Sequence, residues 1–184
     1  MKRSLLTLIG ALACASASTM IPHASAQNAD ALSQLDPLFP VGDYTACTGN
    51  LMASAKQSGH ATTGHARVEK VLGGKWIALH YDEDRSPANS QPYSVVQYIR
   101  YDATSKRFAT VVLDNTTSGA PYSTGISSGL NGNKMTFDES FAGDKEAKYR
   151  DTFTKDGDAF THTGTMLDKD GKWVKTDEET CRKS

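Results

Sequence analysis

Residues 63–83 read TGHARVEKVLGGKWIALHYDE, and this stretch decides the fold class. It contains two runs rich in residues that favour β-strands, 63–71 and 75–83, with Gly73-Gly74 between them. Glycine adopts the positive φ angles that tight hairpin turns require. The stretch therefore predicts two antiparallel strands joined by a short turn.

The same alternation of short runs and turn residues continues along most of the chain. Pairs that tolerate positive φ recur at the boundaries, as in Asn131-Gly132, Asp156-Gly157 and Asp170-Gly171. The expected strands are residues 43–52, 63–71, 75–83, 93–101, 107–115, 121–128, 133–141, 147–154, 158–167 and 172–181. Successive hairpins without a helical crossover predict an antiparallel meander.

Closure of this meander into a barrel is expected from its length. Alternation is clearest where Met135, Phe137 and Phe141 share one face. An open sheet of this size would expose two strand edges, whereas a closed barrel has none. We therefore expect an all-β fold, an antiparallel up-and-down barrel of about eight to ten strands. An open sandwich of two sheets is the alternative, because evenly spaced strands fit both architectures.

The N-terminus has the composition of a secretory signal peptide. Two basic residues precede a short apolar run, and Ala24-Ser25-Ala26 fits the small-residue rule for cleavage. We expect residues 1–26 to be removed, residues 27–42 to form an N-terminal segment with a short helix, and residues 43–184 to form the barrel domain. The apolar run is too short to span a bilayer, so the expected location is the periplasm or the external medium.

Two cysteines bracket the barrel domain, Cys47 on the first expected strand and Cys181 on the last. In an oxidising compartment this pair is expected to form a disulfide. The bridge would close a loop of about 134 residues, for which the chain-entropy model gives roughly 5 kcal/mol. First and last strands are neighbours in a closed up-and-down barrel, so the bridge would lock them together. Two separate buried thiols, or a cysteine nucleophile, are the alternatives.

Three segments resemble a lipocalin-like family of bacterial secreted proteins whose function is unassigned. The segments are 67–76 (RVEKVLGGKW), 101–108 (YDATSKRF) and 148–153 (KYRDTF), and the resemblance covers roughly residues 62–181. It implies a calycin-like barrel with a possible interior pocket. The family supplies no agreed catalytic residues, and the cysteine pair departs from its simpler members.

Composition and motifs exclude several classes of function. The chain has 20 basic and 21 acidic residues, so it lacks the positive surface that nucleic acids and anionic membranes attract. No glycine-rich phosphate loop, paired C-x-x-C or H-E-x-x-H motif is present. We therefore expect no cofactor, no metal site, no nucleic-acid partner and no membrane span.

Four histidines follow the signal peptide: His60, His65, His80 and His162. A structural or exposed role is expected for each, because none belongs to a ligand motif. A haem barrel with His80 or His162 as the axial ligand is a less favoured alternative.

A ligand site is nevertheless predicted around one of these histidines, since a polar side chain beside aromatic side chains is typical of small-ligand pockets. His80 shares strand parity with Trp76, and the neighbouring strand could bring Gln97 or, on its other face, Tyr98 and Arg100. If that face points inward, these residues would line the barrel.

The favoured function is a binding module: an exported barrel that holds a small apolar or amphipathic molecule. One alternative is an enzyme in the barrel mouth that uses His80 or His162 as a base with Asp82 or Asp114. Another is a fully packed envelope protein that acts through its surface. The sequence names no ligand, no catalytic residue and no oligomeric state.

Overall fold

The computed structural model describes residues 31–54, 58–116 and 120–183, so the expected signal peptide lies outside the described residues. The described chain is all-β, with a single helical turn at residues 31–33. The strands are β1 Gly42–Leu51, β2 His60–Val71, β3 Trp76–Glu83, β4 Ser94–Asp102, β5 Arg107–Asp114, β6 Ser123–Ser127, β7 Leu130–Asn131, β8 Lys134–Phe141, β9 Tyr149–Asp156, β10 Ala159–Leu167 and β11 Trp173–Arg182. Each expected strand is present, and positive φ angles at Gly73 and Gly74 form the expected turn.

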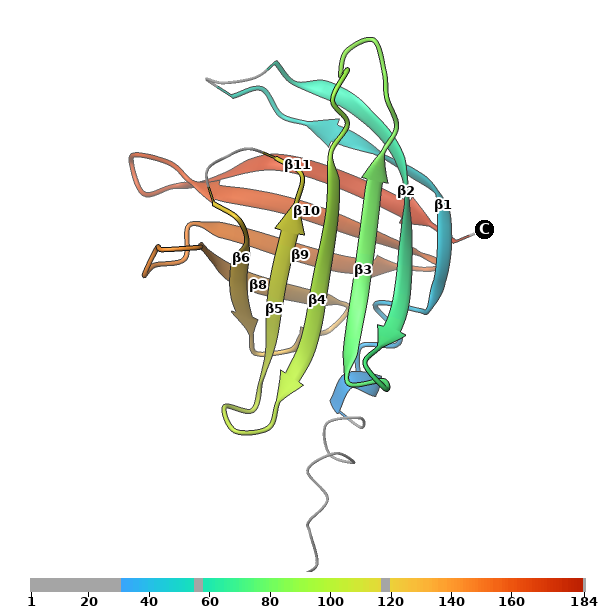
Figure 1. Cartoon of the computed structure of the whole chain (residues 1–184), viewed down its shortest axis with the longest axis vertical. Coiled ribbons are helices and arrows are strands. Elements are labelled where there is room, and N and C mark those ends of the chain that lie inside the picture. The colour runs from blue at the N-terminus through green and yellow to red at the C-terminus, as the bar shows by residue number, and fades with distance from the viewer. Residues whose placement is uncertain (1–30, 55–57, 117–119, 184) are drawn as a thin grey trace, which may run out of the picture.

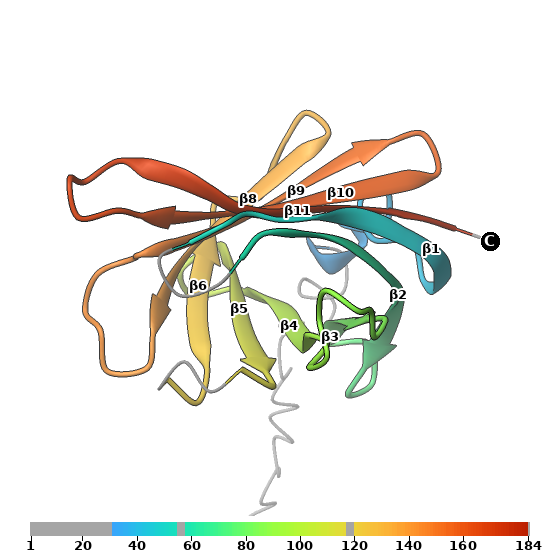
Figure 2. The same cartoon turned by 90° about the horizontal axis from the view of Figure 1, so that it is seen from above.

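The sheet closes into a barrel. Neighbouring strands follow chain order and are antiparallel, β1 pairs with β11, and β6 pairs with β8 across the two-residue β7. Seen from above, β2 to β6 form one wall, and β8 to β11 with β1 form the other (Figure 2). The predicted fold class, an antiparallel up-and-down barrel, is confirmed with ten long strands.

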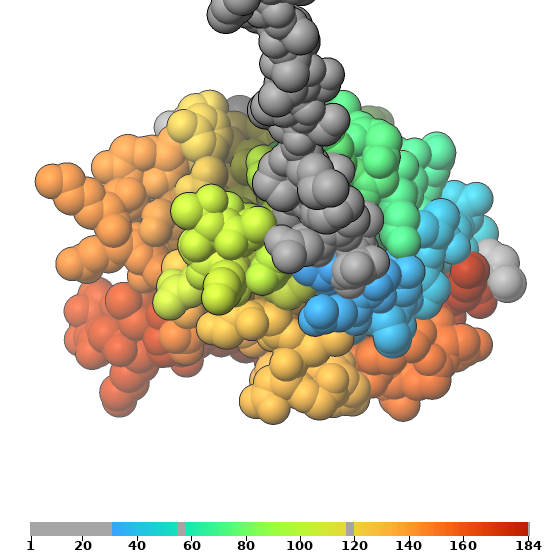
Figure 3. All heavy atoms as spheres, turned by 90° about the horizontal axis from the view of Figure 1, so that it is seen from below, coloured from blue at the N-terminus to red at the C-terminus, as the bar shows by residue number. Residues whose placement is uncertain are grey.

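The N-terminal segment plugs one end of this barrel. It lies at the lower end in Figure 1, where β1 begins, and Figure 3 shows it among the strand ends when the molecule is viewed from below. Leu35 and Phe39 are completely buried, and the Phe39 ring lies edge-on to Phe153 with 5.0 Å between the ring centres. Asp36 forms an ion pair with Lys70 of β2. We call this the plugged end and the opposite end the far end.

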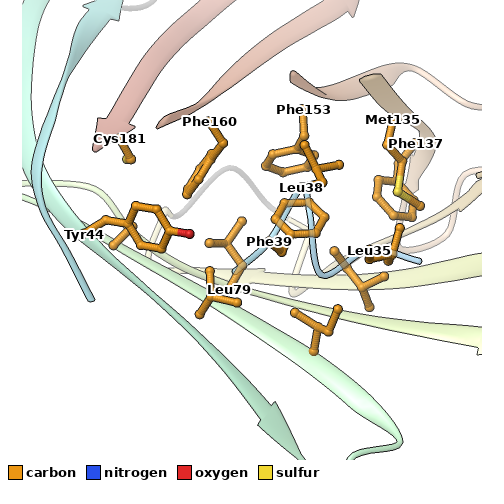
Figure 4. Close-up of a cluster of buried hydrophobic side chains, with 14 of the residues drawn as sticks. Leu35, Leu38, Phe39, Tyr44, Leu79, Met135, Phe137, Phe153, Phe160 and Cys181 are labelled. Atoms are coloured by element: carbon orange, nitrogen blue, oxygen red, sulfur yellow. The ribbon is translucent and has the colours of Figure 1, made fainter. Parts of the chain in front are cut away.

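Apolar side chains fill the plugged half of the interior. Figure 4 shows the N-terminal leucines and Phe39 surrounded by rings from β8, β9 and β10. Tyr44 packs edge-on against Phe160 and donates a hydrogen bond to the Pro40 carbonyl. The cluster consists of Leu32, Leu35, Leu38, Phe39, Tyr44, Cys47, Ala66, Val68, Ile77, Leu79, Ile99, Phe108, Met135, Phe137, Phe153, Phe160 and Cys181.

A disulfide joins the first and last strands. Cys47 and Cys181 are direct cross-strand partners in the β1–β11 ladder, and both are buried at the edge of the apolar cluster. The expected pairing is therefore present. Among the described residues, no helix has the length and apolar character needed to cross a membrane.

Candidate functional site

Polar side chains cross the interior between the apolar cluster and the far end. Each comes from the inward-facing parity of its strand, which alternates with the outer face. We call this set the acidic layer: Gln97 of β4, Ser123 of β6, Glu139 of β8, Asp151 of β9, His162 of β10, and Asp177 and Glu179 of β11. It holds four carboxylates and one imidazole, and none of its seven members is a lysine or arginine.

One side of the layer is a buried pair of carboxylates bridged by an amide. Gln97 Nε2 donates to Glu139 Oε1 at 3.3 Å and to Asp151 Oδ2 at 3.1 Å. Ser123 Oγ donates to Glu139 Oε2 at 2.7 Å. Burial, followed by the charge of Asp151, raises the pKa of Glu139 well above its ordinary value. The protonated form of Glu139 is therefore favoured over the charged form more strongly than in an exposed glutamate.

The other side of the layer surrounds His162 with carboxylates. Its Nε2 lies 2.8 Å from Asp151 Oδ1, and its Nδ1 lies 3.2 Å from both Asp177 Oδ2 and Glu179 Oε2. Burial alone lowers the pKa of the imidazole, but the charge of Asp151 and hydrogen bonds to Asp151 and Glu179 raise it well above its ordinary value. The ring thus has a carboxylate at each nitrogen.

This side of the layer is partly exposed to solvent. The side chain of His162 is 22% exposed, and those of Asp177 and Glu179 are 16% and 12% exposed. Burial raises the pKa of Glu179, while its hydrogen bond to His162 opposes that shift. A partly exposed group of carboxylates around one imidazole is suited to binding a positively charged group.

Gly164 of β10 makes room for the outermost contact of the layer. A Cβ atom at this position would fall against the Tyr149 hydroxyl and the Asp177 carboxylate. Without it, Tyr149 donates a hydrogen bond of 3.0 Å to Asp177 Oδ1, and Thr176 Oγ1 donates a second of 2.7 Å to the same oxygen. These two donors hold the Asp177 carboxylate in place.

A second buried carboxylate holds the β3–β4 connection at the far end. Glu83 accepts hydrogen bonds from Asn89 Nδ2 at 2.8 Å and the Tyr93 amide at 3.0 Å, and lies 2.9 Å from His60 Nε2. Burial acts to raise the pKa of Glu83, but these hydrogen bonds outweigh it and lower the pKa. Because all its contacts are made within the protein, Glu83 is a structural anchor of the loop.

The predicted ligand-binding residues lie on both faces of the wall. Gln97 is buried in the acidic layer. Trp76, His80, Tyr98 and Arg100 have the opposite parity from the buried Ile77, Leu79 and Ile99, which places them on the outer face. The condition under which Trp76 and His80 would line the interior is therefore not met, because this face of β3 points outward. Whether any of the five binds a ligand stays a prediction.

On the outer face these residues form their own contacts. Arg100 lies over the Trp76 ring, 5.2 Å from its centre, and His80 Nε2 lies 3.1 Å from Glu69 Oε1. A groove of about 480 Å³ runs over β1 to β3 and includes His80 among its lining residues. The groove is open, and its histidines are paired with neighbouring carboxylates, so it is the weaker candidate.

Sequence reasoning missed most of the acidic layer, although the signal was present. Glu139 shares the parity of Met135 and Phe137, and Asp177 and Glu179 share the parity of Cys181. A carboxylate on an otherwise apolar face is the pattern to look for. Of the pairs considered for an enzyme, His162 does contact a carboxylate, but the partners are Asp151, Asp177 and Glu179.

Comparisons with known proteins agree with the barrel and assign no activity. The structure is similar to the crystal structure of Rv2717c from M. tuberculosis, with a TM-score of 0.61 and 15% identity over 84% of this chain and 97% of that chain. At this identity the likeness concerns the fold alone. No curated protein matches the chain. A family model described as a protein of unknown function, DUF1579, matches residues 40–183. The chain therefore belongs to the DUF1579 family.

Proposed function

We propose that the protein is an exported, lipocalin-like barrel that binds a small amphipathic molecule through the acidic layer. The positively charged group of the ligand lies against Asp177 and Glu179, and its apolar part lies against the aromatic rings nearby. The observation that carries this proposal is the set of three carboxylates around one imidazole in a partly exposed region of the interior.

The packing of the interior favours an amphipathic ligand over a wholly apolar one. The plugged half is filled by the apolar cluster, so an apolar molecule there would have to displace closely packed side chains. At the acidic layer, the Phe141 and Tyr149 rings lie 6.4 Å apart between centres and supply an aromatic surface beside the carboxylates. A cationic head with a short apolar tail matches both surfaces.

Export is supported by the buried Cys47–Cys181 disulfide, since such bridges persist in oxidising compartments. The expected cleavage after Ala26 would leave the plug attached to the barrel. Mass spectrometry of the protein from the periplasm and medium of an expressing bacterium would report the mature N-terminus.

An enzyme is the second candidate, and the contact between His162 and Asp151 favours it. A general base needs a free nitrogen lone pair within reach of its substrate. Here both ring nitrogens already face carboxylates. The arrangement therefore supports binding better than proton abstraction.

Calorimetric titration with three probes of equal chain length tests the binding proposal. We expect octylamine to bind at least tenfold more tightly than octanoate or octanol. The double variant Asp177→Asn/Glu179→Gln should lose this preference, and the outer-face control Asp82→Asn should keep it. Preferential binding of octanoate, or unchanged octylamine binding in the double variant, would contradict the proposal.

A further inference from the structure

We propose that His162 Nδ1, Asp177 and Glu179 form a binding site for one divalent transition-metal ion, with Zn²⁺ as the best fit. This proposal rests on the proposed function, because both place a cation against the acidic layer. Here the cation is a metal ion. It needs no apolar ligand.

The three ligand atoms already have the spacing of a metal site. Nδ1 of His162 lies 3.2 Å from Asp177 Oδ2 and 3.2 Å from Glu179 Oε2, and all three ligand atoms lie within 4.8 Å of one another. Ligands at the usual zinc–nitrogen and zinc–oxygen distances in a tetrahedron are separated by roughly 3.3 Å. The His162–Asp177 and His162–Glu179 distances would thus change little on binding a zinc ion.

The surrounding contacts orient these ligands as in known metal sites. Asp151 Oδ1 lies 2.8 Å from the other ring nitrogen of His162, which is the carboxylate–histidine arrangement that fixes a metal-binding imidazole. Tyr149 and Thr176 both donate to Oδ1 of Asp177, which leaves Oδ2 directed at His162. Ligands and supporting residues are therefore distinct atoms with distinct roles.

An independent observation lies on the opposite side of Glu179. Thr62 of β2 is only 5% exposed, and its buried Oγ1 makes no hydrogen bond of normal geometry. It faces inward in the same cross-strand row as Gly49 and Glu179, and Gly49 places no side chain between them. The buried Tyr81 hydroxyl interacts with the Thr62 side chain and is close enough to Glu179 to feel its charge.

Buried hydroxyl groups normally make full hydrogen bonds, and Thr62 and Tyr81 have only each other near Glu179, so both can bond to a further polar group there. Three protein ligands leave a zinc ion its fourth position for water or another oxygen. Thr62 and Tyr81 are placed to hydrogen-bond that fourth ligand.

The ligand types decide between classes of metal. Ca²⁺ takes six to eight oxygen ligands, and Mg²⁺ keeps several waters and avoids imidazole. One imidazole with two carboxylates suits borderline ions such as Zn²⁺. The thiol ligands that softer ions prefer are engaged in the disulfide.

Titration of tag-free, chelator-treated protein with ZnCl₂ tests the site. We expect one Zn²⁺ per chain, at least a hundredfold weaker binding in His162→Gln, and unchanged binding in the outer-face control His80→Gln. Asp151→Asn should bind Zn²⁺ about 10 to 100 times more weakly, because it removes only the orienting partner. The absorption spectrum of the Co²⁺ form should change in Asp151→Asn while the stoichiometry is retained.

Circular dichroism of each metal-free variant reports folding, and Asp177→Asn/Glu179→Gln is the second variant if His162→Gln fails to fold. The metal site is overturned if the wild-type protein binds no Zn²⁺. It is also overturned if Zn²⁺ binding survives in both His162→Gln and Asp177→Asn/Glu179→Gln, or if it is lost in His80→Gln. Titration of the same metal-free samples with octylamine separates the two proposals. Octylamine binding without Zn²⁺ binding overturns only the metal site, and the reverse overturns only the amphipathic ligand.

Discussion

Glu139 is the residue whose environment depends most on its neighbours. It is 1% exposed, and its two oxygens accept hydrogen bonds from Gln97 and Ser123 while Asp151 lies close by. A carboxylate next to a buried carboxyl group favours the protonated form of that group. A group that binds its proton more tightly when folded links the stability of the protein to pH.

The sign of that linkage predicts a loss of stability at higher pH. The pKa of Glu139 is raised on folding, so its contribution is complete below pH 4.5 and is lost as the pH rises through the raised value. Each unit of that rise costs up to about 1.4 kcal/mol. Glu139→Gln, a neutral mimic of the protonated acid, should flatten the decline measured by urea unfolding between pH 5 and 9. The outer-face variant Asp138→Asn should leave the decline unchanged; equal slopes in wild type and Glu139→Gln would contradict this assignment.

Gly164 is a second residue whose identity the layer requires. Gly164→Ala would push its Cβ against Tyr149 and Asp177, and overpacking of this kind typically costs about 1 to 3 kcal/mol. Urea denaturation should show that loss, whereas Thr163→Ala on the outer face of the same strand should cost less than about 1 kcal/mol. A Gly164→Ala variant as stable as wild type would show that the close contact is absent.

The N-terminal plug is the element that fills the plugged end of the barrel interior. Phe39 is completely buried against Phe153 and Phe160, although it precedes the first strand. Removing a buried phenylalanine side chain costs about 3 to 5 kcal/mol. Phe39→Ala should lower the free energy of unfolding by that amount, and Val41→Ala, at a side chain that is 51% exposed, should change it little. Equal, small effects of both variants would mean that the plug does not pack in solution.

The strands show what sequence reasoning could and could not reach. Turn glycines and strand runs predicted every long strand, because both signals are local. The inward face could not be assigned at Trp76 and His80, because a strand with apolar groups on both faces carries no clear parity. Where a cysteine or phenylalanine marked the inner face, as in β8 and β11, the parity of Glu139 and Asp177 could have been read. The convergence of Asp151 from β9 and of Asp177 and Glu179 from β11 on His162 could not, since the register between neighbouring strands is not readable from the sequence.

At the scale of the whole molecule, the barrel is closed by hydrogen-bonded ladders on every side, and the disulfide adds a covalent link to one of them. The β1–β11 ladder extends over six residue pairs, including Cys47 with Cys181. The bridge therefore supports a closure that the backbone already makes.

The double variant Cys47→Ala/Cys181→Ala is accordingly expected to fold but to be less stable by about 2 to 5 kcal/mol. Urea unfolding measures the loss, and the far-ultraviolet circular dichroism spectrum should remain that of the wild type. Unfolding of the double variant in the absence of denaturant would show that closure depends on the bridge.

The central claim is that the acidic layer inside the barrel, not its outer face, binds a cationic ligand. The most direct measurement is a nuclear magnetic resonance titration of ¹⁵N-labelled, metal-free protein with octylamine. We predict that the largest amide shifts fall on β9 to β11 around Asp151, His162 and Glu179. Shifts centred instead on the outer groove at Arg67 and His80, or no shifts at all, would contradict the claim.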